Sequence, residues 1–519
     1  MTTTWTPGKE MAIGRHGMVA AQHREAAQAA ADVLSKGGNA MDAAIAGALV
    51  LSVVEPWLSG IGGGGFLIHR SGATGTVETL DFNMVSGAAT DPADYPLSEG
   101  DDGDWFNWPA VKGNVNLIGP LSIGVPGAIA GFAEGLARHG TITFAEALAP
   151  AIHAAEVGLK VDWFTNLCLS IDATNLLTDP ASAETLLRKG APPAIGTTLP
   201  LPAKAATLRR LAEAGPRDFY EGELARLMVE DLQALGSKLT PKDFAAYQPQ
   251  WRAPLSFDYR GNVIHAMAGL SGGPAFQDVM NRLAADPAFD TPDTAPQAQH
   301  FAAFADAIRA AYSHRLNYVG HAGEHGVDPG CTSHISVVDQ WGNAVSLTNT
   351  LLSRFGSKVT SARTGVLMNN AMMWFDPRPN TPNRIAPSVR PLANMCPLVV
   401  EAKDGATLAI GAAGGRQIMP ALAQLVSMRL DFGMDLGAAL SLPRIDASSQ
   451  RIKVNVGTPL ATFGMISRSH DADLVEDSLY PVQFAIPSGA ERRADGTFHG
   501  MSHPNTPWSA AVPAEGEAT

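Results

Sequence analysis

Two short segments of alternating polarity face each other across a turn in the middle of this chain. Residues 333–339 and 343–350 alternate with period two, and a Gln-Trp-Gly-Asn turn joins them. This pattern predicts an antiparallel β-hairpin. Thr332 then stands at the start of the first strand, and Thr350 stands at the end of the second, directly across from it. Opposed residues in such a pair are neighbours, so we expect their hydroxyls to lie within hydrogen-bonding distance.

A threonine at the start of such a strand has a known route to reactivity. Its hydroxyl is a poor nucleophile near neutral pH and needs an adjacent base. An N-terminal threonine obtains that base from its own α-amine, which has a pKa near ~8. For Thr332 this requires cleavage of the Cys331–Thr332 bond, which the hydroxyl itself begins by attacking the preceding carbonyl. The hairpin pattern alone, however, favours an ordinary strand-starting threonine.

Alanine-rich helices and a run of glycines precede the hairpin. Residues 24–56 predict two helices, with a Gly-Gly pair ending the first and Asn39 capping the second. The segment 59–70 then runs from four consecutive glycines into an apolar strand. A phosphate-binding loop has a strand before its glycines and a helix after them. We therefore interpret these glycines as positions of close backbone approach beneath a site.

Charge and composition exclude several classes of function. The formal net charge of −13 argues against a nucleic-acid or anionic-membrane partner, since both require basic patches. No apolar run reaches the ~20 residues needed to span a bilayer, and the N-terminus lacks the pattern of a secretory signal. The three cysteines, Cys168, Cys331 and Cys396, are too few for a disulfide framework. We expect a soluble, cytoplasmic protein with no metal site and no cofactor.

Eight segments along the chain match, in order, the motifs of one protein family. They are residues 17–66, 124–132, 219–225, 303–320, 332–351, 365–372, 390–400 and 411–418. On these segments the chain resembles the γ-glutamyltranspeptidase family of N-terminal-nucleophile hydrolases. The resemblance implies an α+β fold, a four-layer αββα sandwich, with self-cleavage before Thr332. Residues 1–331 and 332–519, about 35 and 20 kDa of the 54.3 kDa chain, would then form one intertwined domain.

The resemblance also implies roles for four catalytic positions. Thr332 matches the nucleophile and new N-terminus, and Thr350 matches the threonine that hydrogen-bonds to it and orients it. Gly414 and Gly415 match the pair whose backbone N–H groups form the oxyanion hole. Glycine suits that role because, without a Cβ, the backbone can approach the developing negative charge.

The residues that would bind a γ-glutamyl group are mostly replaced in this chain. Asn83 stands where the family has an arginine for the glutamyl carboxylate, and Ala393 and Asn394 stand in place of two serines. Three apolar side chains replace the polar residues that hold the amino group: Leu352, Ala371 and Trp374. A buried ammonium without a carboxylate partner is costly. We therefore expect a substrate other than a γ-glutamyl compound.

The replacements predict a small, dry substrate pocket with a few polar contacts. Leu352 and Trp374 would shrink the pocket, and Arg416, next to the oxyanion glycines, would clamp a carboxylate. Asn83 and Asn394 would bind a carbonyl or an amide. Two alternatives stay open: Arg416 as a solvated charge or an ion-pair partner, and the asparagines as satisfied structural residues.

This description fits a tiny amide that carries a carboxylate. One branch that it resembles, the oxamate amidohydrolases, converts oxamate to oxalate and ammonia, and we take this reaction as the specific prediction. The alternatives are a γ-glutamyl hydrolase or transferase, an acylase of a larger β-lactam side chain, and a non-catalytic binding protein on the same fold. The expected partners are the small-molecule substrate and the two cleaved fragments, alone or within a larger homo-oligomer.

Overall fold

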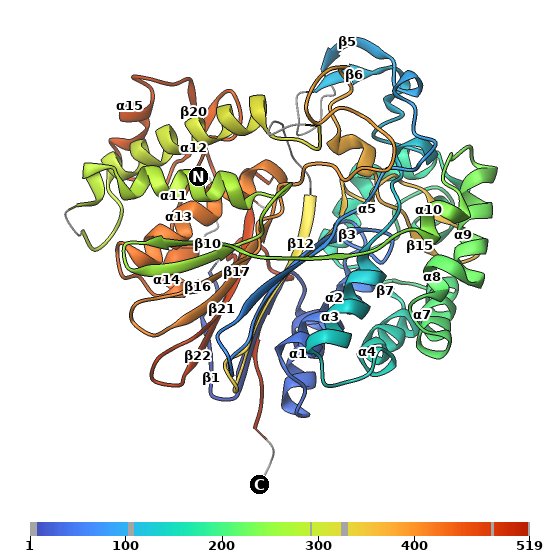
Figure 1. Cartoon of the computed structure of the whole chain (residues 1–519), viewed down its shortest axis with the longest axis horizontal. Coiled ribbons are helices and arrows are strands. Elements are labelled where there is room, and N and C mark those ends of the chain that lie inside the picture. Colours follow the sequence, from blue (N-terminus) through green and yellow to red (C-terminus); the bar gives the residue numbers. More distant parts are fainter. Residues whose placement is uncertain (1–7, 102–107, 291–292, 323–330, 479–481, 517–519) are drawn as a thin grey trace.

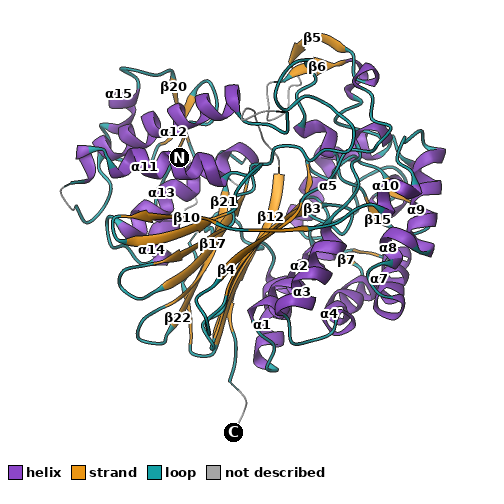
Figure 2. Cartoon of the chain, viewed as in Figure 1, coloured by secondary structure: helices purple, strands orange, loops and turns teal. Residues whose placement is uncertain are grey.

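Two seven-stranded antiparallel β-sheets lie face to face at the centre of the structure, and helices cover the outer face of each sheet (Figure 1, Figure 2). This computed structural model describes residues 8–101, 108–290, 293–322, 331–478 and 482–516. The four layers, helix–sheet–sheet–helix, confirm the α+β sandwich that the sequence predicts.

Both sheets combine strands from the two parts of the chain that Thr332 divides. The first sheet has the order β1 (Ala12–Gly14), β22 (Phe498–Ser502), β21 (Ile486–Arg492), β17 (Thr407–Ala413), β16 (Leu398–Glu401), β11 (Asn262–Ala266), β10 (Leu255–Tyr259). The second has the order β23 (Ala510–Pro513), β2 (Gly17–Ala21), β12 (Cys331–Asp339), β13 (Ala344–Leu352), β3 (Gly64–Arg70), β4 (Val77–Phe82), β9 (Gln250–Arg252). Each sheet takes strands from before and after Thr332, so the two parts of the chain are interleaved.

Smaller strand groups lie outside the two sheets. They are β5 (Leu97–Asp101) with β6 (Pro109–Val111), β7 (Leu159–Lys160) with β8 (Thr198–Leu199), β14 (Thr360–Ser361) with β15 (Val366–Leu367), and the group β18 (Ile445–Asp446), β19 (Ile452–Asn455) and β20 (Ala472–Val475). They connect and cover the main elements.

The helices divide between the two outer faces in chain order (Figure 1). On the side of the second sheet lie α1 (Arg24–Ser35), α2 (Ala40–Val54), α3 (Ala128–His139), α4 (Phe144–Val157), α5 (Trp163–Leu176), α6 (Pro180–Leu186), α7 (Pro202–Ala214), α8 (Asp218–Glu221), α9 (Glu223–Ala234) and α10 (Pro241–Ala245). On the side of the first sheet lie α11 (Gly273–Ala284), α12 (Ala298–Tyr318), α13 (Ile418–Leu430), α14 (Leu436–Ser441) and α15 (Thr462–Ile466). Among the helices of the described residues, none combines the length and the apolar character that a membrane span requires.

Helix α2 is buried along its whole length, beneath the strands of the central hairpin. It packs against α1 and α4 on one side and against β12 and β13 on the other, and every residue from Ala40 to Val54 is buried. The Asn39 side chain accepts hydrogen bonds from two backbone N–H groups of the first turn, and Asp42 accepts one from the Asn39 N–H at 2.8 Å. The predicted pair of helices and the Asn39 cap are both confirmed.

The four consecutive glycines lead into β3, where they allow neighbouring backbone segments to come close. A Cβ atom on Gly63 would lie 2.0 Å from the carbonyl oxygen of Thr350, and one on Gly65 would lie 2.0 Å from that of Thr348. The Gly63 carbonyl also accepts hydrogen bonds from the N–H groups of Gly127 and Ala128. The interpretation as positions of close backbone approach is confirmed, and one of these positions supports Thr350.

Replacement of Gly63 by alanine tests this close approach. The added methyl group must push the Thr350 carbonyl away, so Gly63→Ala should lower the free energy of unfolding by about 1–3 kcal/mol. Urea unfolding followed by circular dichroism measures this change. Gly464→Ala is the matched control, because open space surrounds the Gly464 position in α15. Equal unfolding midpoints for both variants would contradict the packing argument.

Candidate active site

The predicted hairpin is formed by β12 and β13, which pair in register from Val338–Ala344 to Ser333–Asn349. At its tip, the buried Asp339 carboxylate accepts hydrogen bonds from the N–H groups of Trp341 and Asn343, at 3.0 and 2.9 Å. The same carboxylate accepts the N–H of Ala40 at 2.9 Å. The hairpin is thereby fixed to the start of α2, and the prediction of an antiparallel hairpin is confirmed.

The other end of the hairpin carries a β-bulge at Thr332. Ser333 pairs with Asn349, but Cys331 pairs with Leu352, so β13 has one more residue than β12 in this interval. Leu352 takes a φ of 92°, which is uncommon for a residue with a side chain. Its N–H donates a hydrogen bond of 2.8 Å to Thr350 Oγ1. The backbone of β13 therefore turns sharply directly beside Thr332.

Thr332 is buried, and its hydroxyl forms no hydrogen bond with any residue that the structure describes. The residue is 1% exposed, and its Oγ1 atom has no hydrogen-bond partner among the residues that the structure describes. The expected bond between the hydroxyls of Thr332 and Thr350 is therefore not formed here, because the bulge removes the regular register on which that expectation depended. Burial of a hydroxyl that has no hydrogen-bond partner lowers the stability of the fold by roughly 1–3 kcal/mol. A role in function is one reason for a protein to retain such a group.

Gly414 and Gly415 form the turn between β17 and α13. Their φ values of 133° and 59° lie in the region that favours glycine. A Cβ on Gly414 would also lie 2.7 Å from the Cα atom of Ala485. This turn thus depends on glycine at both positions, and the oxyanion role of the pair stays a prediction.

Two contacts between the sheets show how Gly414 is placed relative to Thr332. Ser346, which pairs with Ser336, donates a hydrogen bond of 3.0 Å to the carbonyl of Ile410. Two residues further along β12 and one residue further along β17, the His334 ring lies against Gly411, where a Cβ would come within 2.3 Å of it. Continuing in this direction, β12 reaches Thr332 and β17 reaches Gly414. The two predicted catalytic groups therefore lie toward the same end of the sandwich.

His334 itself has a structural role. Its Nδ1 and Nε2 atoms lie 2.9 and 2.8 Å from the hydroxyl oxygens of Thr348 and Ser336. Burial lowers the pKa of His334 to about 3, so the ring is neutral near pH 7. It packs between the two sheets and has both nitrogens satisfied.

A buried carboxyl group near Thr332, the predicted nucleophile, was not singled out from the sequence. Glu55 follows the last turn of α2, is 0% exposed, and accepts a hydrogen bond of 2.6 Å from the Ser333 hydroxyl. Burial raises the pKa of Glu55 to about 8. The only signal in the sequence is an acidic residue directly after an apolar helix, in the run Val53-Val54-Glu55-Pro56.

The replaced γ-glutamyl positions come together in one apolar cluster. Leu352, Ala371, Trp374 and Ala393 are all fully buried within it. The other members are Phe66, Met84, Trp108, Leu117, Met267, Met373 and Met395. Trp374 belongs to a short 3-10 turn, Ala371–Trp374, and its indole nitrogen has no hydrogen-bond partner in the described part of the chain. The predicted apolar surroundings are therefore present at these positions.

The two asparagines differ in how their side chains are satisfied. Asn83 donates to the carbonyl of Pro391 at 3.3 Å and accepts the N–H of Met84 at 2.9 Å, as a structural asparagine does. Asn394 is 2% exposed, yet neither its Nδ2 nor its Oδ1 atom has a hydrogen-bond partner within the described ranges. Of the two, only Asn394 keeps an amide without a partner in the described residues, and its role as a substrate contact stays a prediction.

Arg416 is buried rather than solvated. Its Nη2 atom donates a hydrogen bond of 2.6 Å to the carbonyl of Ser448, and its guanidinium lies over the Tyr312 ring at 5.7 Å from the centroid. The Tyr312 hydroxyl in turn donates to the Arg416 carbonyl. The alternative of a solvated surface charge is therefore wrong, because Arg416 is 8% exposed and its guanidinium is bonded to the Ser448 carbonyl. A role as carboxylate clamp stays a prediction.

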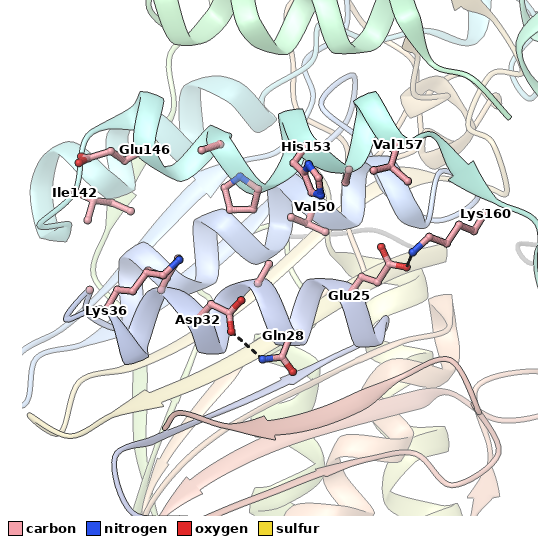
Figure 3. A pocket seen from close by; sticks show the side chains of 16 residues that line it. Glu25, Gln28, Asp32, Lys36, Val50, Ile142, Glu146, His153, Val157 and Lys160 are labelled. Carbon is pink, nitrogen blue, oxygen red and sulfur yellow. Dashed lines mark hydrogen bonds and ion pairs between the residues drawn. The ribbon is translucent and has the colours of Figure 1, made fainter. Parts of the chain in front are cut away.

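Two further features lie apart from these residues. A groove of about 710 Å³ opens between α1 and α4, where Glu25 pairs with Lys160 and Gln28 with Asp32 (Figure 3). None of its sixteen lining residues is one of the candidate site residues. Over the ranges that the structure describes, no group of three or more His, Cys, Asp or Glu side chains is placed to hold a metal ion.

Comparison with known proteins gives matches over nearly the whole chain. A family model described as Gamma-glutamyltranspeptidase matches residues 26–329 and 322–504. The chain is 31% identical over 536 residues to the Acylase ACY 1 proenzyme of Pseudomonas sp. (strain V22), with 95% of each protein covered. It is 29% identical over 545 residues to the Glutathione hydrolase proenzyme of Escherichia coli (strain K12), with 95% of this chain and 91% of that protein covered.

The fold has a solved counterpart as well. The structure superposes on a cephalosporin acylase from Bacillus halodurans with a TM-score of 0.88 and 24% identity, over 99% of both chains. That protein shares the fold of the N-terminal-nucleophile hydrolases. The expected resemblance is thus confirmed, and the chain belongs to the γ-glutamyltranspeptidase family.

Proposed function

We propose that this protein is a self-processing amidohydrolase that uses Thr332 as its nucleophile. The observation that carries the proposal is the buried Thr332 hydroxyl, which has no hydrogen-bond partner among the described residues and lies at a bulge, toward the same end of the sandwich as Gly414 and Gly415. Membership in a family whose relatives are named as proenzymes supports the processing step. A protein that only binds a ligand would not need a buried hydroxyl and a glycine turn placed toward the same end of the sandwich.

In the processing step, Thr332 Oγ1 attacks the carbonyl carbon of Cys331. The C–N bond breaks as an ester forms, and the hydroxyl proton passes to the departing amine nitrogen. Water then hydrolyses the ester, which leaves a carboxylate on Cys331 and frees the Thr332 hydroxyl. The α-amine is already free once the C–N bond has broken, so processing produces both the nucleophile and its base.

In the hydrolytic step, the α-amine of Thr332 accepts the hydroxyl proton while Oγ1 attacks the amide carbon of the substrate. The protonated amine then delivers that proton to the departing nitrogen, and water releases the acyl group. Backbone N–H groups of Gly414 and Gly415 would stabilise the oxyanion, and such a donor typically contributes about 3–4 kcal/mol. This chemistry requires no cofactor.

The proposed substrate is the amide of a small acid, with oxamate as the first candidate. Leu352, Ala371 and Trp374 offer no charge to an ammonium group, which disfavours a γ-glutamyl substrate. The amide of Asn394, which has no hydrogen-bond partner in the part of the chain that the structure describes, can donate to a carbonyl or a carboxylate and accept from an amide N–H. Arg416 directly follows the two glycines of the predicted oxyanion hole. Its guanidinium would bind the oxygen of the oxamate carboxylate that Asn394 does not contact.

A second candidate is the acylase reaction on a larger amide. It is supported by two relatives named Acylase ACY 1 proenzyme, 31% and 32% identical over 95% of each chain. The fully buried side chains of Leu352 and Trp374 weigh against it, since a bulky acyl group needs room that they occupy.

Intact mass under denaturing conditions tests the processing step. Wild-type protein should give two fragments of about 35 and 20 kDa, with threonine at the start of the smaller one. Thr332→Ala should remain a single 54.3 kDa chain, because it lacks the attacking oxygen. Thr174→Ala, at an exposed position of α5, should cleave as wild type does. Cleavage of Thr332→Ala would exclude Thr332 as the nucleophile.

A substrate panel tests the reaction itself. We expect ammonia release from oxamate and none from glutamine, and the Thr332→Ala variant should release none from either compound. Release from glutamine would restore the γ-glutamyl assignment. Release of glutarate from a glutaryl-amide in place of ammonia from oxamate would favour the acylase candidate.

Alanine variants of the two asparagines should separate a substrate contact from a structural one. Asn394→Ala should lower kcat/KM by roughly 5–100-fold, the equivalent of one lost hydrogen bond, without loss of stability. Asn83→Ala should instead lower the free energy of unfolding by about 1–3 kcal/mol, because it leaves a buried N–H and a buried carbonyl unpaired. Steady-state kinetics and urea unfolding of both variants decide between these outcomes.

A further inference from the structure

Glu55 lies where the end of α2 meets the open end of the hairpin. The segment after α2 holds β13 directly: the N–H of Leu351 donates to the Leu58 carbonyl at 3.0 Å, and that of Phe355 donates to the Trp57 carbonyl at 3.1 Å. The same segment holds β12 through the Ser333 hydroxyl, which donates to Glu55 Oε2 at 2.6 Å. The short segment after α2 thus bonds to β12 through Ser333, and to β13 and the residues that follow it through Leu351 and Phe355.

Ser333 connects this segment to the nucleophile position. It follows Thr332 in β12, and neighbouring residues of a strand point to opposite faces. The Ser333 hydroxyl points toward α2, as its bond to Glu55 shows. Movement of Ser333 would therefore move the Thr332 backbone and redirect the Thr332 hydroxyl, which has no hydrogen bond of its own to hold it among the described residues.

The surroundings of Glu55 favour its neutral form. Its second oxygen, Oε1, is buried and has no hydrogen-bond partner in the described part of the chain. Cys168 of α5 interacts electrostatically with Glu55, and the other charged groups around Cys168 are Arg354, Asp172 and Asp162. Arg354 is already paired with Asp172 at 2.8 Å, so it is not available to neutralise a second carboxylate. One hydroxyl contact does not compensate for a buried negative charge.

We propose that Glu55, in its neutral form, is a positioning residue for self-cleavage: through the Ser333 hydroxyl it holds the end of β12 so that Thr332 Oγ1 faces the carbonyl carbon of Cys331. The inference rests on the proposed function, since it assigns a role within the cleavage of the Cys331–Thr332 bond. Ionisation of Glu55 would strengthen the bond from the Ser333 hydroxyl, but it would also leave a buried negative charge with one donor beneath the bulge, and the rearrangement that solvates this charge would move Ser333 with it.

The direction of the pH effect follows from the raised pKa of Glu55. An exposed glutamate has a pKa near ~4.3, whereas burial raises that of Glu55 to about 8. The neutral form therefore predominates below about pH 8 and is lost as the pH rises through that value. A cleavage rate that follows the neutral fraction should fall about tenfold from pH 7 to pH 9. The α-amine of Thr332 does not contribute to this profile, because it is still a peptide nitrogen before cleavage.

The test follows self-cleavage of freshly synthesised full-length chain, from cell-free translation, by gel electrophoresis at pH values from 6 to 9. Wild type should slow about tenfold between pH 7 and 9. Glu55→Gln keeps the shape and a neutral acceptor for the Ser333 hydroxyl, so it should cleave at pH 7 within about threefold of wild type. It should also show no decline toward pH 9. Ser333→Ala should be slow at every pH, because the link between Glu55 and β12 is absent.

Glu213→Gln is the matched control, since it makes the same chemical change at an exposed position and should keep the wild-type profile. A wild-type rate that does not fall with pH, or the same fall in Glu55→Gln, would overturn the role of Glu55 while leaving the proposed function intact. A wild-type chain that stays uncut at every pH would overturn both. Circular dichroism of each variant at pH 7 and 9 separates slow cleavage from loss of fold.

Discussion

The burial of the β12–β13 hairpin on both faces is the constraint on which the rest of the structure depends. On one face α2 packs against both strands, and on the other β17 packs across from β12. A strand that is enclosed in this way cannot shift its register easily, since a shift by one residue would exchange its two faces and break the buried hydrogen bonds of Ser333 with Glu55 and of His334 with Thr348. The bulge at Thr332 is therefore a fixed feature that the surrounding layers determine, and the hairpin end has one defined geometry.

Much of this architecture was predictable from local sequence patterns. The hairpin follows from strict alternation around a polar turn, the α2 cap follows from Asn39, and the four glycines follow from their position before an apolar strand. Each of these signals depends on residues close together in the chain. Local propensity and tertiary packing agree at these positions, which is why sequence reasoning succeeds there.

The features that escaped prediction depend on residues far apart in the chain. The extra residue of β13 at the bulge changes the relation between Thr332 and Thr350, and alternation alone contains no sign of it. The partnership of Glu55 and Ser333 joins positions separated by 278 residues. The contrast between Asn83 and Asn394 depends on which carbonyl and N–H groups surround each amide. Family resemblance locates Thr332, Thr350, Asn83 and Asn394 but not Glu55, and the hydrogen bonds of all of them are set by the folded environment.

The interleaving of strands from before and after Thr332 has a consequence for how this protein would persist once cut. Neither part contains a complete sheet, so each part supplies edges that only the other can cover. Folding must therefore finish while the chain is still continuous, and the cut pieces would afterwards be held together by strand pairing and not by a peptide bond. Reassembly after denaturation would become a meeting of two molecules that depends on their concentration. The lifetime of the folded, cut protein would then be set by its unfolding rate and not by its free energy of unfolding.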